Sequence, residues 1–214
     1  MLTAQRSPHT PEIMEWHMSS DLSQSTILGR SGSNACTFIA LCCGHLFHQA
    51  NLQPPTNGTD PDNGWQVCLR KVIISGNEIH DDIFEHDPVN VSVDEAEQIA
   101  GSKCHVEKLM PQLDVFGHNA TGQLSTVFEG LTETQRPNCS VVISDECAFL
   151  FIVNTDGSAM LIDSHHHKQY GALISYAQPN DVGHMAPWLP RMMHQTWKST
   201  LKTTSVTPAI YRQV

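Results

Sequence analysis

The distribution of apolar residues predicts a long buried helix in the first quarter of the chain. Residues 35–50 (ACTFIALCCGHLFHQA) place apolar side chains on most faces of a helix, and Ser33 or Asn34 can cap its start. Residues 1–20 hold two prolines and little periodicity, so we expect an arm or an extended segment there. Residues 51–64 hold three prolines and two glycines, which predicts an exposed loop.

Two further segments have helical patterns. Residues 92–100 (SVDEAEQIA) open with the capping-box pair Ser92 and Glu95, and Gly101 follows as a stop signal, so we expect a short helix. Residues 187–199 predict a last helix near the end of the chain.

Strand patterns dominate the second half. Residues 65–74 (WQVCLRKVII) start with alternation and end in β-branched residues, which predicts an early strand. Apolar runs at 140–153, 159–163 and 171–177 predict further strands, and the turn residues 154–157 (NTDG) join the middle pair as a hairpin. Helices first and strands second are typical of an α+β fold.

Charge narrows the range of partners. The chain has 214 residues, which suits one large domain, and its formal net charge is −10. Phosphate binding needs clustered cations, so we expect no nucleic-acid partner and no binding to an anionic membrane surface. A basic partner suits this charge better.

The sequence also suggests a compartment. It has no run of about 18 apolar residues, and its first 20 residues lack the apolar core of a secretory signal. The chain has seven cysteines, an odd number, and it is too large to need disulfides for stability, so we expect reduced thiols. These features predict an intracellular protein, in the cytoplasm or the nucleus.

Cys36 has a local setting that none of the other cysteines shares. It follows a loop with two glycines (GRSGSNA) and falls in the first turn of the predicted helix. The positive end of a helix stabilises a thiolate, and the free backbone N–H groups there can bind an oxyanion. A small buried hydrophobic residue is the alternative interpretation.

Asp163 and His165 form a second candidate pair, at the end of an apolar run (MLID). Positions i and i+2 point to one face of a strand, so the two side chains are neighbours if the strand continues. A carboxylate beside an imidazole holds its tautomer and raises its basicity. With Cys36 this pair would support acyl transfer from an amide or isopeptide bond.

A metal site is a rival interpretation of the same segment. Asp163, His165 and His167 alternate, so all three could bind zinc or another divalent ion from one strand face. No Cys-x-x-Cys pair is present to complete a structural zinc site. For His166 and His167 we favour ordinary surface polarity, and we expect no metal and no cofactor.

Three short blocks together resemble the tegument-type ubiquitin-specific cysteine proteases, a family named for the herpesvirus large tegument protein. The blocks are residues 32–41 (GSNACTFIAL), 161–165 (LIDSH) and 171–174 (GALI). The resemblance implies an α+β papain-like cysteine protease fold. Its helical half carries the nucleophile and is followed by an antiparallel sheet half. We therefore expect a catalytic domain over residues 21–214, with 1–20 as an N-terminal arm.

The resemblance also implies roles for single residues. Cys36 would be the nucleophile, His165 the general base and acid, and Asp163 the orienting carboxylate. The family uses a glutamine upstream of the cysteine to bind the oxyanion, and Gln24 is the match by position, with Asn34 as the alternative donor. Ser164 departs from the family, whose viral members tend to have proline there.

The activity that the resemblance implies is a deubiquitinase, which cleaves after the C-terminal glycine of ubiquitin. Other ubiquitin-like modifiers, peptides or an acyltransferase reaction are alternatives, as is a non-catalytic module that binds ubiquitin or a metal. Ubiquitin has an apolar patch rimmed by cations, which acidic clusters could steer. The candidate clusters are Asp81, Asp82, Glu85 and Asp87, and then Asp94, Glu95 and Glu97.

Overall fold

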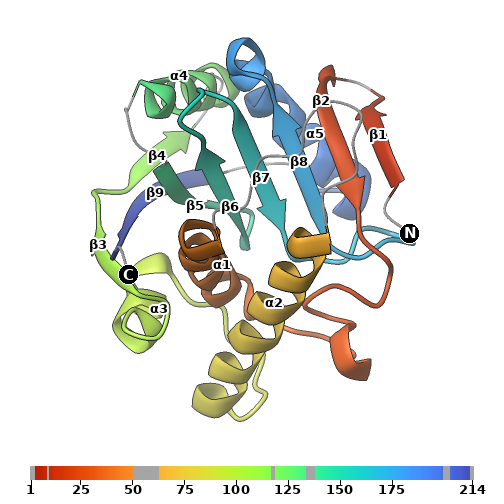
Figure 1. The fold of residues 1–214 in the computed structure, drawn as a ribbon, viewed down its shortest axis with the longest axis vertical. Coiled ribbons are helices and arrows are strands. Elements are labelled where there is room, and N and C mark those ends of the chain that lie inside the picture. The colour runs from red at the N-terminus through yellow and green to blue at the C-terminus, as the bar shows by residue number, and fades with distance from the viewer. Residues whose placement is uncertain are drawn as a thin grey trace.

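One antiparallel sheet runs through the structure. The computed structural model describes residues 3–8, 10–50, 63–116, 119–133, 138–199 and 203–212. The sheet has nine strands in the order β1-β2-β8-β7-β6-β5-β9-β3, and β4 also pairs with β9 (Figure 1). The strands are β1 (Thr3–Ser7), β2 (Thr10–His17), β3 (Val106–Leu109), β4 (Leu113–Phe116), β5 (Asn138–Ser144), β6 (Cys147–Val153), β7 (Ala159–Asp163), β8 (Leu173–Ala177) and β9 (Thr203–Tyr211).

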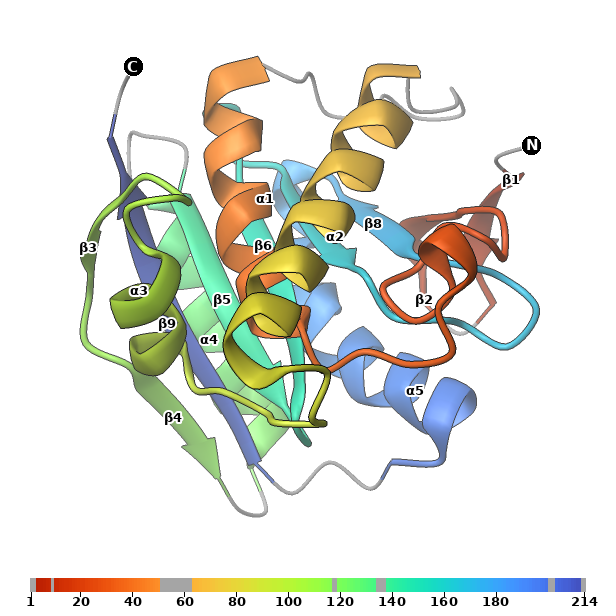
Figure 2. The same cartoon turned by 90° about the horizontal axis from the view of Figure 1, so that it is seen from below.

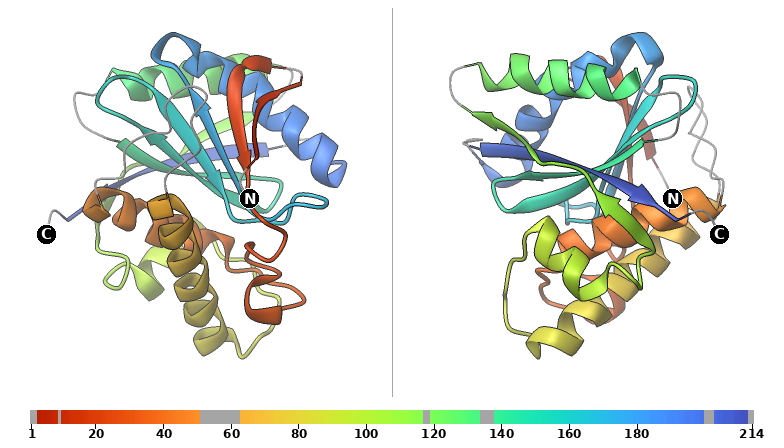
Figure 3. Two further views of the ribbon diagram at one scale, coloured as in Figure 1. Left: turned by 45° about the vertical axis from the view of Figure 1, so that its right-hand side comes forward. Right: turned by 90° about the vertical axis from the view of Figure 1, so that its left-hand side faces the viewer.

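Helices cover both faces of this sheet. Figure 3 shows α4 and α5 on one face, and α1, α2 and α3 on the other. The helices are α1 (Cys36–Ala50), α2 (Asn63–Phe84), α3 (Val93–Ala100), α4 (Ala120–Thr132) and α5 (Met185–Trp197), with short 3-10 turns η1 (Ile27–Gly29) and η2 (Pro179–His184).

Strand β6 explains why the sheet is buried on both sides. Leu150 and Ile152 belong to the apolar core that includes α1, whereas Phe149, Phe151 and Val153 belong to the core under α4 and α5. Successive side chains of a strand point to opposite faces, so a strand that is apolar throughout needs cover on both.

Helix α1 lies between the sheet and α2. Figure 2 shows α1 and α2 side by side in front of the strands, and α1 contacts β6 directly. The two helices approach closely at Gly76 of α2, where an added Cβ would lie 2.9 Å from the backbone nitrogen of Ile39. The missing side chain at Gly76 therefore helps to hold α1, and with it Cys36, in place.

We predict that Gly76→Ala destabilises the fold by about 1–3 kcal/mol, because the new methyl group overpacks the α1–α2 contact. Gly130→Ala is the matched control: Gly130 is exposed in α4, and an added Cβ there meets no atom within 4 Å. Such a change stabilises a helix by about 0.4–1 kcal/mol. Urea unfolding measures both variants, and equal midpoints would contradict the close approach of the two helices.

The structure confirms the α+β class and three of the predicted helices. Residues 35–50 contain α1, and the predicted last helix corresponds to α5. The capping box of α3 is complete, because Ser92 Oγ accepts from the Glu95 backbone N–H at 3.3 Å and the Glu95 carboxylate accepts from the Ser92 backbone N–H at 2.8 Å.

The predicted strands of the second half are also confirmed. The run at 140–153 is two strands, β5 and β6, joined by a tight turn in which Asp145 and Glu146 both have positive φ. Strands β6 and β7 form the predicted hairpin around residues 154–157, where the Asn154 N–H donates to the Ser158 carbonyl at 2.9 Å.

The strand predicted at 65–74 is wrong, because these residues lie inside α2. Trp65, Leu69, Val72 and Ile73 are buried, and this spacing of four, three and one is helical. The β-branched residues at the end of the segment favoured a strand, but burial of one helical stripe over a 22-residue helix overrides that preference.

The segment expected as an arm is part of the sheet. Within residues 1–20, β1 and β2 form a hairpin, and β2 pairs with β8 along Ile13 to His17. Of the loop predicted at 51–64, residues 51–62 lie outside the described residues, and Asn63 begins α2. The sequence patterns did not predict β3, β4, α4 or β9.

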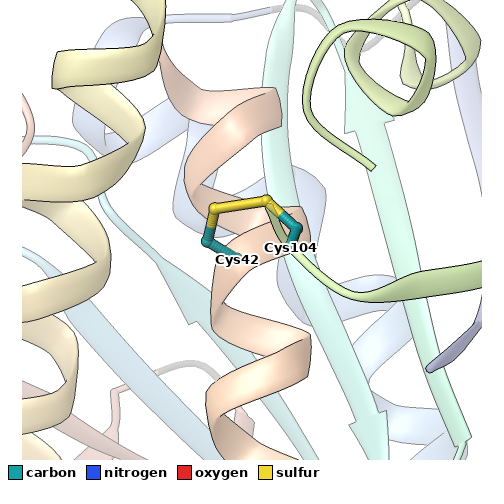
Figure 4. Close-up of a disulfide and its surroundings, with 2 residues drawn as sticks. All are labelled: Cys42 and Cys104. Atoms are coloured by element: carbon teal, nitrogen blue, oxygen red, sulfur yellow. A yellow bond between two sulfur atoms is a disulfide. The ribbon is translucent and has the colours of Figure 1, made fainter. Parts of the chain in front are cut away.

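The expectation that all cysteines are reduced is wrong for two of them. A disulfide joins Cys42, in the middle of α1, to Cys104, in the turn after α3 (Figure 4). Their separation of 62 residues gives no local signal for this contact, which only the packing of α3 against α1 creates. The other five cysteines are not in disulfides. No helix in the described ranges is long and apolar enough to cross a bilayer.

Candidate active site

Cys36 is the first residue of α1, and hydrogen bonds from neighbouring elements fix this end of the helix. The Ser33 hydroxyl donates to Asn77 Oδ1 of α2 at 2.6 Å. The Thr37 hydroxyl donates to the Val91 carbonyl, just before α3, at 2.9 Å. The Cys36 side chain is buried, and its sulfur therefore has a defined position at the positive end of the helix.

Asp163 and His165 lie together, though not as neighbours on one strand face. Strand β7 ends at Asp163, and the chain turns so that the His165 ring folds back onto the carboxylate. His165 Nδ1 lies 2.6 Å from Asp163 Oδ1, and the His165 backbone N–H donates to the same oxygen at 2.8 Å. An ionised carboxylate only accepts, so Nδ1 carries the proton and Nε2 is left for another partner.

The Cys36 thiol lies near His165, close enough for each group to shift the pKa of the other. Burial alone would raise the pKa of Cys36, but the hydrogen bond and charge of His165, with smaller contributions from the Ala148 backbone and Thr37, lower it. Burial would lower the pKa of His165, but Asp163, then Cys147 and Cys36, raise it well above its usual value. The two shifts together favour a thiolate–imidazolium pair.

The Asp163 carboxylate is wholly buried. Burial would raise its pKa, but the charges and hydrogen bonds of His165 and His167 hold that pKa far below its usual range. Asp163 therefore stays ionised at neutral pH and fixes the protonation of the ring beside it.

The two candidate oxyanion donors lie in different surroundings. Gln24 is buried: its Nε2 donates to the Ser33 carbonyl at 3.0 Å, and its Oε1 accepts from the Ser164 hydroxyl at 2.7 Å. Gln24 thus bridges the loop before Cys36 and the link between Asp163 and His165. Asn34 Nδ2 instead donates to Asn90 Oδ1 at 2.6 Å in an exposed position.

Sequence reasoning missed Cys147 and the turn before it. Cys147, the first residue of β6, is a second thiol near His165, and it contributes to the raised pKa of that ring. The Cys36 sulfur lies 3.9 Å from the backbone oxygen of Glu146. A cysteine at the start of a strand has no motif around it, so only the tertiary structure identifies this neighbour.

The surface role expected for His167 is wrong. His167 is only 3% exposed, and its Nε2 lies 2.8 Å from Asp163 Oδ2. It is buried because residues of α5, Thr196 and Trp197, pack on its ring, and α5 lies about 30 positions further along the chain.

The side chains of this segment are arranged differently from those of a metal site. Asp163 lies between the two rings and accepts from both His165 and His167, so its oxygens and their nitrogens face one another rather than a common point. Among the described residues no group of three His, Cys, Asp or Glu side chains is arranged to hold a metal ion.

The acidic clusters are partly occupied by internal contacts. Asp81 accepts hydrogen bonds from the two terminal guanidinium nitrogens of Arg30, at 2.6 and 2.9 Å, and these bonds lower the pKa of Asp81. Glu95 closes the capping box with Ser92. The exposed members that stay available to a partner are Asp82, Glu85, Asp87 and Asp94.

We predict that a small alkylating reagent modifies Cys36 at lower pH than an ordinary thiol, because the pKa of Cys36 is lowered. In His165→Ala the partner that lowers this pKa is lost while burial continues to raise it. The inflection of the alkylation rate should therefore move to higher pH.

The tryptic peptide that contains Cys36 spans residues 31–70 and also contains Cys42, Cys43 and Cys68, so fragmentation of this peptide by tandem mass spectrometry assigns the alkylation to Cys36. Cys43 is the internal control, because burial raises its pKa to about 12. Unchanged inflections in wild type and His165→Ala would contradict the ion pair.

The fold is that of the papain-like cysteine proteases, as comparison with solved structures shows. One similar structure is the ubiquitin-specific protease encoded by murine cytomegalovirus tegument protein M48, in complex with a ubiquitin-based suicide substrate. It matches with a TM-score of 0.55 and 12% identity, over 92% of this chain and 86% of that one.

A second solved structure, the Pseudomonas avirulence protein AvrPphB, matches with a TM-score of 0.47 and 7% identity over 83% of this chain and 92% of that one. No known family profile and no curated protein sequence matches the chain. The likeness therefore rests on three-dimensional structure, and at these identities it establishes the fold.

Proposed function

We propose that this protein is a thiol-dependent hydrolase that cleaves the peptide or isopeptide bond after the C-terminal glycine of ubiquitin. The observation that carries the proposal is the placement of three side chains: His165 Nδ1 lies 2.6 Å from Asp163 Oδ1, and Cys36, at the start of α1, lies close enough to His165 for each to shift the pKa of the other. The M48 structure, solved with a ubiquitin-based suicide substrate, supports ubiquitin as the substrate.

The chemistry follows from the protonation states of this pair. The Cys36 thiolate attacks the carbonyl carbon of the substrate glycine, and the electron pair of the C=O bond moves onto oxygen. As the tetrahedral intermediate collapses, the C–N bond breaks and His165 Nε2 gives its proton to the leaving amine. A thioester of Cys36 and a neutral His165 remain.

Hydrolysis of the thioester reverses these roles. His165 Nε2 takes a proton from water as the water oxygen attacks the thioester carbonyl, and the C–S bond then breaks to release the glycine carboxylate. Cys36 returns as a thiolate beside a protonated His165. Asp163 keeps the ring in one tautomer through both steps and does not itself take up the proton.

Charge supports a cationic substrate tail. Glu146, in the turn before β6, is exposed, and its backbone oxygen lies 3.9 Å from the Cys36 sulfur. With a formal net charge of −10, the protein attracts a partner whose tail carries arginine before Gly-Gly.

We predict that ubiquitin bearing a C-terminal electrophile forms a covalent adduct with the wild-type protein and none with Cys36→Ala. Cys147→Ala is the stricter control, because the Cys147 thiol also faces His165, and this variant should still form an adduct at Cys36. Intact mass and peptide mapping locate the label.

Two results would overturn the proposal. Equal labelling of wild type and Cys36→Ala would assign the reaction to another thiol. Labelling by the tail of a different modifier, without labelling by ubiquitin, would keep the thiol chemistry but change the substrate.

We predict that Gln24→Ala lowers kcat about 100- to 1000-fold with a smaller change in KM, because it removes an N–H donor that acts on the oxyanion of the transition state. Asn34→Ala, the matched amide control, should lose far less, because the Asn34 amide lies in an exposed position, whereas Gln24 is buried and a donor stabilises an oxyanion more strongly away from water. Steady-state hydrolysis of a fluorogenic ubiquitin conjugate measures both, and a larger loss in Asn34→Ala would reassign the donor.

A further inference from the structure

The catalytic carboxylate proposed above has a second histidine on its other oxygen. Asp163 Oδ1 accepts from the His165 ring at 2.6 Å and from the His165 backbone at 2.8 Å. Asp163 Oδ2 accepts from His167 Nε2 at 2.8 Å. One buried carboxylate therefore lies between two imidazole rings that come from the same short segment after β7.

The second oxygen matters for the orientation of the first. A carboxylate held only at Oδ1 can rotate about its Cβ–Cγ bond, and an Oδ2 atom buried without a donor costs about 1–3 kcal/mol. The bond from His167 removes that cost and fixes the plane of the carboxyl group. Oδ1 is then presented to His165 in one direction.

We propose that His167 is a positioning residue for catalysis, which donates Nε2–H to Asp163 Oδ2 and so holds the carboxylate in the orientation that aligns His165 with Cys36. This inference rests on the proposed function, because the aligned pair is the catalytic pair. His167 acts through its bond to Asp163.

Two further contacts hold His167 in place. Its backbone exchanges two hydrogen bonds with Tyr170, at 2.9 and 2.8 Å, so the loop after β7 closes on itself. The Trp197 ring at the end of α5 packs on both imidazoles, with centroids 5.4 Å from His165 and 5.2 Å from His167. The two histidines therefore cannot move apart without displacing the same indole.

The hydrogen bonds assign opposite tautomers to the two rings. His165 donates from Nδ1 to Asp163 Oδ1, and this leaves its Nε2 without a proton when the ring is neutral. His167 donates from Nε2, and its Nδ1 lies 3.3 Å from the Thr196 hydroxyl, which donates to the Met192 sulfur at 3.9 Å.

His167 lines a small cavity of about 210 Å³ together with other titratable groups. None of these groups takes the place of His167 as the donor to Asp163 Oδ2. The centroid of the His17 ring, in β2, lies 6.1 Å from that of His167, and His17 Nε2 lies 3.2 Å from Glu15 Oε2. The remaining groups that line this cavity are Lys168 and Tyr170 from the loop and Arg191 from α5.

Two substitutions separate positioning from simple packing. His167→Leu fills a similar volume but has no donor, and we expect kcat for the ubiquitin conjugate to fall about 10- to 100-fold with little change in KM. His167→Gln keeps an N–H donor at similar reach and should recover most of that loss. His166→Leu, at the neighbouring half-buried histidine, is the matched control and should leave kcat unchanged.

Alkylation of Cys36 gives a readout that needs no ubiquitin. In His167→Leu its inflection should move to higher pH, because His165 is no longer held against the thiol, and in His167→Gln it should stay near the wild-type value. If ubiquitin is not the substrate, this comparison still decides the role of His167. Equal inflections in all three proteins would overturn the inference.

Nitrogen-15 NMR of the unmodified protein tests the same assignment without any substitution, and so holds even if His167→Leu does not fold. We expect a proton on His167 Nε2 and a proton on His165 Nδ1. A His167 ring without a proton on Nε2 would overturn the proposal, because it could not donate to Asp163.

Discussion

A carboxylate that leaves water must recover the hydrogen bonds of its lost hydration shell, and Asp163 is wholly buried at the end of β7. It recovers them from three N–H groups, all within the next four residues of the chain. The turn that follows β7 is therefore shaped by the demand of one buried charge. Because His165 supplies two of these donors, the shape of that turn and the aim of the imidazole are set together.

The cysteine reaches this imidazole from a distant part of the chain, and polar side chains connect the two parts. Gln24 bonds both Ser33, just before α1, and Ser164, between Asp163 and His165. Ser33 in turn bonds Asn77 of α2. The Ser164 hydroxyl donates the bond to Gln24. Proline, the residue typical of the viral proteins that this chain resembles, has no donor and could not form this bond.

Much of this arrangement was accessible from local sequence patterns, because the signals lie within a few residues. A glycine-rich loop before a helix marks Cys36, and an apolar run that ends in Asp-x-His marks Asp163 and His165. These patterns predict which residues lie together. Their catalytic roles stay a prediction that the experiments above address.

The rest of the structure depends on contacts between distant segments, which local patterns do not contain. Segment 65–74 is rich in β-branched residues yet is helical, because its buried stripe packs on α1. Strand β9 contains Pro208, and its sequence does not favour a strand. It nevertheless pairs with β5 on one side and with β3 and β4 on the other. His167 and Cys147 become parts of the site only through α5 and through the turn before β6.

Helix α1 contains two cysteines in opposite redox states. Cys36 can act as a nucleophile only when it is reduced, whereas Cys42, six residues along the same helix, is oxidised in its bond to Cys104. Both cysteines of that bond line a surface cavity of about 560 Å³, although each of them is buried. A reductant that reduces an oxidised Cys36 can also break this bond, which joins α1 to the segment after α3.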